Sequence, residues 1–243
     1  KPKLPFNFKN KEGATVIAAI LGDGGIDIRK MPNYHNKSRV LRKKVYNAFS
    51  DIFGKIKGNS KNHNKLEQIY LPKIIGIILV HCLGMGYGRK TEFNPGIPEF
   101  IKESGKDINS AFLQQMYDDE GYVDYNKSLS RRGVGIKLAN SLKAELEYHN
   151  KIKETHDERY APTLIKDIKD ILNSLNIETS KLICTEIYKT KVGVYNTKWS
   201  TYINKKHNLK NFIENVNFSL KRKQLRLLRA FNTFHDYEKS KKE

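Results

Sequence analysis

Apolar residues in the first half of the chain recur at spacings that separate helices from strands. Between Leu41 and Phe53 they return at four-residue steps, which places them on one face of a helix. Apolar and polar residues alternate from Ile26 to Lys30, as in a half-buried strand, and residues 31–33 supply a turn. The predicted elements are helices over 13–22, 40–53 and 73–83, and strands over 26–30 and near 55–57 and 66–71.

The second half repeats this order with more inserted. Its predicted elements are helices over 108–119, 163–175, 209–216 and 221–234, strands over 122–125 and near 135–138, and a β-hairpin over 183–203 that turns near Gly193. Residues 84–107 are rich in Gly, Pro and charge and predict a linker. Residues 141–160 form a charged insertion, and a basic arm (1–12) and a charged tail (236–243) flank the whole.

The predicted order of elements in each half is therefore helix, two strands, helix, two strands, helix. This order predicts an α+β protein of two similar halves, with residues 1–97 in the first and 98–243 in the second.

The first helix of each half ends in an acid followed by a glycine. The two acids, Asp23 and Glu120, lie 97 positions apart. Glycine at a helix end often adopts the left-handed conformation, but a negative charge there opposes the helix dipole. For one copy alone, a buried helix with a chance acid remains an adequate explanation. Two copies of the same unfavourable choice indicate a duplicated acid site.

Residues 16–24 (VIAAILGDG) and 113–121 (LQQMYDDEG) resemble the LAGLIDADG motif, and the chain resembles a single-chain, two-motif homing endonuclease. The resemblance implies two pseudo-symmetric αββαββα-like halves, whose motif helices pack side by side at a pseudo-twofold axis. It also implies antiparallel sheets that form a DNA-binding saddle.

A stripe of small residues, Ala14, Ala18 and Gly22, runs down the first motif helix and suits such packing. In the second helix the matching places hold Ala111, Gln115 and Asp119. Gln115 and Asp119 are larger than the pattern allows, so we expect them to hold the second helix away from the first. On this expectation Gln115→Gly is tolerated or tightens the packing.

Two carboxylates at one end of a helix pair form an oxygen-rich site that suits Mg²⁺. Such ions activate water and stabilise both oxygens of a phosphodiester displacement. The resemblance assigns Asp23 and Glu120 as catalytic acids and metal ligands, each serving one strand of a long DNA target and leaving short 3′ overhangs. The motif register makes Asp118 and Asp119 less suitable as ligands.

Two lysines carry a related expectation. Lys90 lies in a segment that resembles the one preceding the second motif in related enzymes, and Lys223 in one that resembles the segment closing the second half. The resemblance implies a basic pocket near the scissile phosphate, where an ammonium stabilises developing charge. Ordinary phosphate contact remains the alternative.

In the family, DNA is read by the strands of the saddle, which lie in the major groove. The candidate reading residues are Arg29, Lys30, Asn33, Arg131, Arg132, Lys137, Lys189, Lys191, Tyr195, Asn196 and Lys198. Exposed strand faces are often basic without reading bases, so each residue taken alone is a weak candidate. Trp199 is better explained as core or hairpin packing than as a platform for base stacking.

Composition supports a polyanionic partner. The chain has 45 basic and 26 acidic residues, a net charge of +19 and a pI near 9.7, which favours nucleic acid or an anionic membrane. The longest apolar run, residues 74–83, is too short to span a bilayer. Polar sequence after Lys1 argues against a signal peptide, and two cysteines in apolar settings suit a reducing compartment, so we expect a cytoplasmic protein.

We therefore expect a Mg²⁺-dependent, site-specific endonuclease that acts as a monomer on double-stranded DNA. The alternative is a nucleic-acid-binding module on the same scaffold, either a maturase-like RNA-folding factor or a DNA-binding regulator. Two retained acids argue against pure binding. An intact intein is disfavoured, because Lys1 and Glu243 are not the terminal residues that splicing requires, although an excised endonuclease domain of an intein or intron remains open.

Binding to duplex DNA should weaken steeply with salt. If the protein neutralises about 6 to 10 phosphates, its affinity should fall by roughly 10³ to 10⁵ between about 50 and 200 mM salt, because counterions are released on binding. Gel-shift titrations at several salt concentrations measure this slope. A flat response would contradict the nucleic-acid interpretation, and preference for structured RNA over every duplex would favour the maturase alternative.

Overall fold

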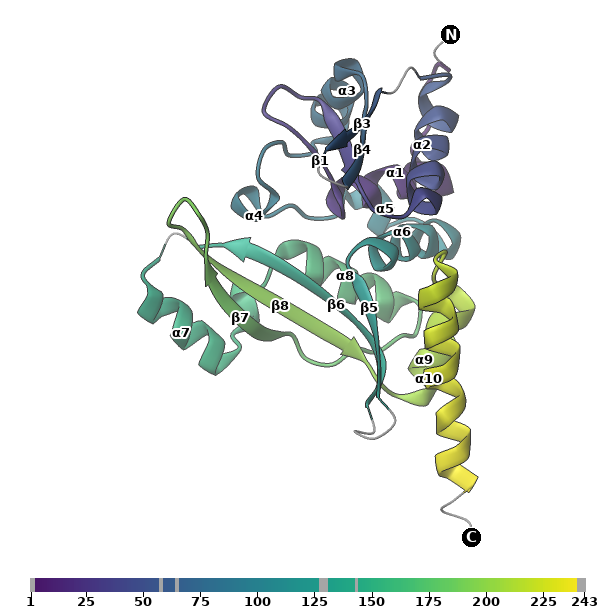
Figure 1. Ribbon diagram of the computed structural model, residues 1–243, viewed down its shortest axis with the longest axis vertical. Helices are drawn as coiled ribbons and strands as arrows, with labels where there is room; N and C mark the ends of the chain where they lie inside the picture. Colours follow the sequence, from purple (N-terminus) through teal and green to yellow (C-terminus); the bar gives the residue numbers. More distant parts are fainter. Residues whose placement is uncertain (1–2, 57–58, 64–65, 127–130, 143, 240–243) are drawn as a thin grey trace. The chain divides into compact units, whose positions relative to one another are not determined.

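The chain forms two compact units, residues 1–119 and 120–243 (Figure 1). The structure, a computed structural model, describes residues 3–56, 59–63, 66–126, 131–142 and 144–239. The units divide after Asp119, whereas the sequence repeat predicts halves that divide after residue 97. The second motif helix accounts for this difference, because it packs against the first motif helix and so belongs to the first compact unit.

The first unit contains six helices and four strands in the part that the structure describes. They are α1 (Lys11–Leu21), β1 (Gly24–Ile26), β2 (Pro32–His35), α2 (Arg39–Phe53), β3 (Asn59–His63), β4 (Leu66–Tyr70), α3 (Lys73–Leu83), α4 (Lys90–Phe93), α5 (Glu99–Lys102) and α6 (Lys106–Asp119). The strands form an antiparallel sheet in the order β1-β2-β4-β3.

Helix α1 lies at the centre of the first unit. Asn10 caps it by accepting a hydrogen bond from the Gly13 N–H at 2.7 Å, and every residue from Gly13 to Leu21 is buried. A helix that is buried on all sides must have neighbours all round it. Here α2, α6 and strands β1 and β2 supply them.

The second unit is built in the same way around a longer sheet. Its elements are β5 (Gly121–Asn126), β6 (Arg131–Ser141), α7 (Leu146–Thr155), a 3₁₀ turn (Glu158–Tyr160), α8 (Thr163–Ser174), β7 (Ile183–Lys189), β8 (Tyr195–Ile203), α9 (Lys206–Asn215) and α10 (Lys221–Lys239). The strands form an antiparallel sheet in the order β5-β6-β8-β7. Trp199 is fully buried in this unit, as core packing predicts.

Several predicted elements are confirmed, and α3 has the predicted bounds. The predicted turn of the first hairpin is wrong. The turn of the first hairpin lies at residues 27–31 and not at 31–33, because the Asp27 carboxylate accepts hydrogen bonds from the N–H groups of Arg29 and Met31. Pro32 is accordingly the first residue of strand β2, a place where proline is tolerated.

The segments predicted as arm, linker, insertion and tail also contain packed residues or helices. In the N-terminal arm, Phe6 and Phe8 pack on Phe53 of α2. The linker contains the short helices α4 and α5, the insertion contains α7, and α10 continues to Lys239 through part of the predicted tail. None of the helices in the described part of the chain has the length and apolar character needed to cross a bilayer.

Gly76 in α3 should resist substitution, against the usual gain of about 1 kcal/mol for Gly→Ala in a helix. A Cβ there would lie 2.1 Å from the backbone oxygen of Lys30, so the hairpin turn that rests on α3 would have to move. We expect Gly76→Ala to lower the free energy of unfolding by about 1–3 kcal/mol. Urea unfolding measures it, with Gly105→Ala as the control, because a Cβ at Gly105 would meet nothing within 4 Å. Equal or higher stability for Gly76→Ala would contradict this packing.

Candidate active site

The first motif acid, Asp23, follows the buried helix α1 and is held by strand β2 and the residue after it. The Asn36 side chain donates a hydrogen bond to Asp23 Oδ2 at 2.6 Å, and the His35 N–H donates to the Asp23 carbonyl at 3.3 Å. These contacts fix both the backbone and the carboxylate of Asp23 at the end of α1.

Gly22, which ends α1, is required by packing and not by backbone conformation. Its φ of −82° is outside the left-handed region. Gly24, the glycine that follows the acid Asp23 and was expected to be left-handed, does not have a positive φ either. A Cβ at Gly22 would instead lie 2.7 Å from Asp119 Oδ2 and 3.0 Å from Asp119 Cβ. The small residue therefore lets the end of α6 approach the end of α1.

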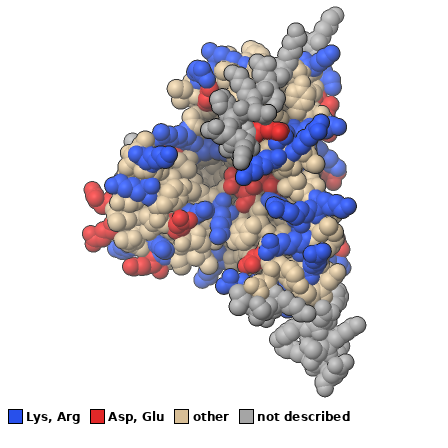
Figure 2. All heavy atoms as spheres, in the orientation of Figure 1, with Lys and Arg blue, Asp and Glu red and all other residues tan. Residues whose placement is uncertain are grey.

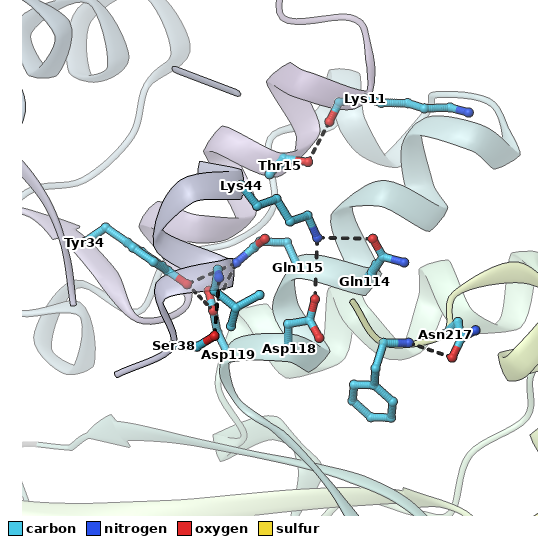
Figure 3. Close-up of polar contacts among 12 residues, drawn as sticks. Lys11, Thr15, Tyr34, Ser38, Lys44, Gln114, Gln115, Asp118, Asp119 and Asn217 are labelled. Carbon is cyan, nitrogen blue, oxygen red and sulfur yellow. Dashed lines mark hydrogen bonds and ion pairs between the residues drawn. The ribbon is translucent and has the colours of Figure 1, made fainter. Parts of the chain in front are cut away.

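Asp119, the last residue of α6, is the centre of a polar network inside the first unit (Figure 3). The Tyr34 hydroxyl donates to Asp119 Oδ1 at 2.6 Å, and the Gln115 amide donates to the same oxygen at 3.0 Å. Asp119 Oδ2 accepts a long hydrogen bond, 3.5 Å, from the Asp23 N–H. Tyr34 and Gln115 are both fully buried and Asp119 is half-buried, so most of the network is shielded from water.

This environment changes the acidity of both ionisable groups. Burial, and next the negative charge of Asp23, raise the pKa of Asp119 to about 7, although the hydrogen bonds from Tyr34 and Gln115 oppose the shift. Burial and the neighbouring Asp119 carboxylate raise the pKa of Tyr34 far above its ordinary value. Tyr34 therefore keeps its proton and remains a hydrogen-bond donor to Asp119.

Gln115 does not hold the two motif helices apart, which corrects the expectation from the sequence. It is fully buried, and its amide nitrogen donates to Asp119 Oδ1 and, at 3.3 Å, to the Tyr34 hydroxyl. Its Oε1 is buried without a hydrogen-bond partner. Replacing Gln115 with Gly would remove two buried hydrogen bonds and leave a cavity, so tighter packing is no longer expected.

A buried ion pair joins α2 to α6 beside this network. Lys44 Nζ lies 3.5 Å from Asp118 Oδ2 and donates to Gln114 Oε1 at 3.1 Å (Figure 3). Burial lowers the pKa of Lys44, and the Asp118 carboxylate opposes that shift. The sequence analysis missed Lys44, Tyr34 and Asn36. The available signal was a pair of adjacent acids at the end of a helix with an apolar face, because a buried carboxylate requires a partner.

The two predicted lysines occupy similar places in their own units. Lys90 Nζ, at the start of α4, donates to the carbonyls of Leu21, at 2.9 Å, and of Gly22. Lys223 Nζ, in the first turn of α10, donates to the carbonyl of Gly121 at 2.6 Å. Each ammonium is thus directed at the backbone beside a motif acid, Asp23 in the first unit and Glu120 in the second.

The predicted reading residues of the second unit divide between the two faces of its sheet. Arg131, Lys137 and Lys198 alternate with buried residues and share the face opposite Trp199. Asn196 belongs to the same face by register, but it is buried, and its amide is hydrogen-bonded to Ser141 and Tyr188, which corrects its prediction as an accessible reading residue. This open face also carries Tyr122 and Tyr202, which the sequence analysis missed.

The remaining predicted residues of that unit lie elsewhere. Arg132 is on the helix side, where its Nε donates to Thr233 of α10 at 2.8 Å. Tyr195 is also on that side, against His149 of α7, and Lys189 lies over the Tyr195 ring. Lys191 is in the turn between β7 and β8.

In the first unit, Asn33 is on the open face of the sheet, since its neighbour Tyr34 is buried on the other face. Arg29 and Lys30 lie in the β1–β2 turn. Arg29 pairs with Asp27 at 3.3 Å, and Lys30 Nζ lies 2.8 Å from His81 Nε2. Lys and Arg side chains are widespread on the face that Figure 2 shows.

The donor set for a metal ion is small. Within the described ranges, no group of three or more His, Cys, Asp or Glu side chains converges as a ready-made metal site. In the first unit, the Asp23 carboxylate, oriented by Asn36, is a hard oxygen donor of the kind that a divalent cation prefers.

The pH dependence of stability should reveal the buried carboxyl of Asp119. Its pKa of about 7 in the native state lies above the ordinary 3.8, so the native state binds this proton more tightly than the unfolded chain does. Its contribution to stability should therefore fall as pH rises from about 4 to about 7, by up to about 1.4 kcal/mol per pH unit. Asp119→Asn removes the carboxyl, so its free energy of unfolding, measured with urea in the presence of EDTA, should change less with pH than that of wild type. Parallel profiles would contradict this assignment.

The sequence was compared with those of known proteins. No protein-family model matches it. The chain is 27% identical over 164 residues to the Replication factor C small subunit of Methanocaldococcus jannaschii, covering 65% of this chain and 8% of that protein. It is 32% identical over 148 residues to the DNA-directed RNA polymerase subunit Rpo1N of the same organism, covering 54% and 10%. The chain thus spans about a tenth or less of the curated relatives it matches.

Solved structures of the homing endonuclease I-DmoI share the architecture. One of its mesophilic variants matches with a TM-score of 0.52 at 14% identity, over 86% of this chain and 91% of that chain. A variant in complex with its target DNA and manganese matches with the same score and identity, over 86% and 95%. At this identity the likeness establishes the fold alone: the chain has the α+β fold of the LAGLIDADG homing endonuclease I-DmoI, with two antiparallel sheets.

Proposed function

We propose that this chain is a metal-dependent, site-specific DNA endonuclease of the LAGLIDADG type. The observation that carries the proposal is the packing of α6 on Gly22, which brings Asp119 to the backbone of Asp23. Glu120 is bonded directly to Asp119, and consecutive Cα atoms are only about 3.8 Å apart. The second motif acid is therefore attached directly to the residue that contacts Asp23.

The two acids have the chemistry that phosphodiester hydrolysis requires. In each half the motif acid, Asp23 or Glu120, would help to hold divalent metal, which when bound activates water and neutralises charge on the phosphate. Asn36 keeps the Asp23 carboxylate in one orientation, and Lys90 and Lys223 place an ammonium beside each motif. Hydrolysis adds water across a P–O3′ bond in each strand and would leave short 3′ overhangs.

The open faces of the two sheets would bind the duplex. Asn33 in the first unit, and Arg131, Lys137 and Lys198 in the second, are placed to contact bases or phosphates. Arg132 and Tyr195 are used in contacts on the helix side, so we no longer propose them as reading residues. The I-DmoI structures in complex with target DNA, in the presence of manganese or magnesium, support both partner and cofactor class.

The curated relatives support the proposal that this chain derives from a mobile genetic element. Two different M. jannaschii proteins each match this chain over a tenth or less of their own length. A related segment in otherwise different hosts is what insertion of a homing element predicts. We therefore propose intron- or intein-linked mobility as the biological role, with one chain acting on one duplex.

Removing the charge of either motif acid should abolish double-strand cleavage and leave DNA binding intact. Asp23→Asn and Glu120→Gln keep size and most hydrogen bonding but weaken metal binding, and loss of an anion near phosphates does not disfavour DNA. The target is first selected from a plasmid library by binding in Ca²⁺, and a supercoiled plasmid carrying it is then cut in Mg²⁺. Asp107→Asn is the control, an exposed acid at the opposite end of α6.

Full linearisation by both variants would mean that these residues are not the catalytic acids. Tight binding by wild type with no cleavage in Mg²⁺ or Mn²⁺ would favour the alternative, a binding module on the same scaffold.

A further inference from the structure

Asp23 is held in place by a shell of hydrogen bonds that approach it from three sides. Asn36 donates to its carboxylate, the His35 N–H donates to its carbonyl, and its own N–H points to Asp119 Oδ2. Side chain and backbone are therefore both restrained. A restrained carboxylate presents its remaining lone pairs in one direction.

The orientation of the Asn36 amide is itself determined by its neighbours. Asn36 Oδ1 accepts a hydrogen bond from the Ser38 N–H at 2.8 Å, so its Nδ2 is the group turned to Asp23. The Asn36 carbonyl accepts from Arg42 Nη1 at 2.5 Å, and Arg42 is buried and ion-paired with Glu67. Flipping the amide would lose the hydrogen bond from Ser38 and would place Asn36 Oδ1 against Asp23 Oδ2, two oxygens that repel each other.

Tyr34 supports the same acid one step further away. Its buried hydroxyl donates to Asp119 Oδ1 at 2.6 Å, and Asp119 in turn faces the Asp23 N–H. Tyr34, Asp119 and Gly22 together fix the point at which α1 ends.

The second half has different residues at the corresponding positions. Gly24, which follows Asp23, pairs with Tyr34, whereas Gly121, which follows Glu120, pairs with Ile136. By this register Tyr34 corresponds to Ile136, and Asn36, two residues later, to Leu138. Ile136 and Leu138 have apolar, buried side chains. Neither can form the hydrogen bonds that Tyr34 and Asn36 supply to the first half.

We infer that Asn36 and Tyr34 are positioning residues for Asp23, and that they make the two half-sites of the endonuclease unequal. This inference rests on the proposed function. The strand served by Asp23 depends on Asn36 and Tyr34, and the strand served by Glu120 does not. Residues that orient metal ligands in this way typically change metal affinity or activity when they are replaced.

The direct test is strand-resolved cleavage by Asn36→Asp. Asp at position 36 has the same shape and still accepts from Ser38, but it turns a carboxylate oxygen towards Asp23. With each strand of the target labelled, we expect cleavage of one strand to slow by about 10- to 100-fold while the other keeps nearly the wild-type rate. Nicked circles should then accumulate. Tyr34→Phe, which removes only the hydroxyl, should slow the same strand to a smaller extent.

Ile136→Val is the matched control, a conservative core substitution at the counterpart of Tyr34, and it should show no strand bias. Equal slowing of both strands by Asn36→Asp, or no slowing, would overturn the inference. A structural role alone would lower the melting temperature without creating strand bias, so melting is recorded for each variant.

A second readout does not require cleavage. Ca²⁺ titrations of the protein–DNA complex, followed by thermal melting, should require higher Ca²⁺ for Asn36→Asp than for wild type or Ile136→Val. An unchanged midpoint would overturn the positioning role. Absence of cleavage by wild type would count against the proposed function, and the Ca²⁺ titration would still test the role of Asn36.

Discussion

The close approach of α1 and α6 is the constraint on which the rest of the site depends. Gly22 has no Cβ, and the space that a Cβ would fill is occupied by the Asp119 side chain. Because α1 is buried from Gly13 to Leu21, it cannot move away without opening the core of its unit. The end of α6 is therefore held against the residue that precedes Asp23.

That approach requires a negative charge to be buried, and the chain stabilises it with donors from three elements. Tyr34 on β2, Gln115 one turn earlier on α6 and the backbone of Asp23 all point to Asp119. Where the first motif helix has Gly22 the second has Asp119, so the contact between the helices combines one small residue with a hydrogen-bonded acid. A buried polar network of this kind is favourable only when its members find partners, which makes Tyr34 and Gln115 structurally coupled to the acid site.

The sequence predicted the parts of the fold that depend on local patterning. Spacing of apolar residues, capping residues and proline placement were enough to predict the motif helices, the amphipathic helix α8 and the apolar helix α3. The hairpin turn at Asp27 was missed, since a side chain and not a Gly–Pro signal stabilises it. Tyr34 and Asn36 were missed for a different reason. Tyr34 acts through Asp119 at the end of α6, 85 residues away in the sequence, and Asn36 is oriented by the backbone N–H of Ser38. Face assignment within the second sheet likewise required the strand register, which separates Lys137 from Arg132.

The most direct test of the central claim is to map the DNA ends that the wild-type protein produces. A library of long plasmid targets would be incubated with the protein in Mg²⁺ and every new end sequenced on both strands. The LAGLIDADG architecture predicts ends at one long site, with short 3′ overhangs whose two cuts face each other across the minor groove. Blunt or scattered ends, or protein bound at a defined site without any new ends, would contradict the account.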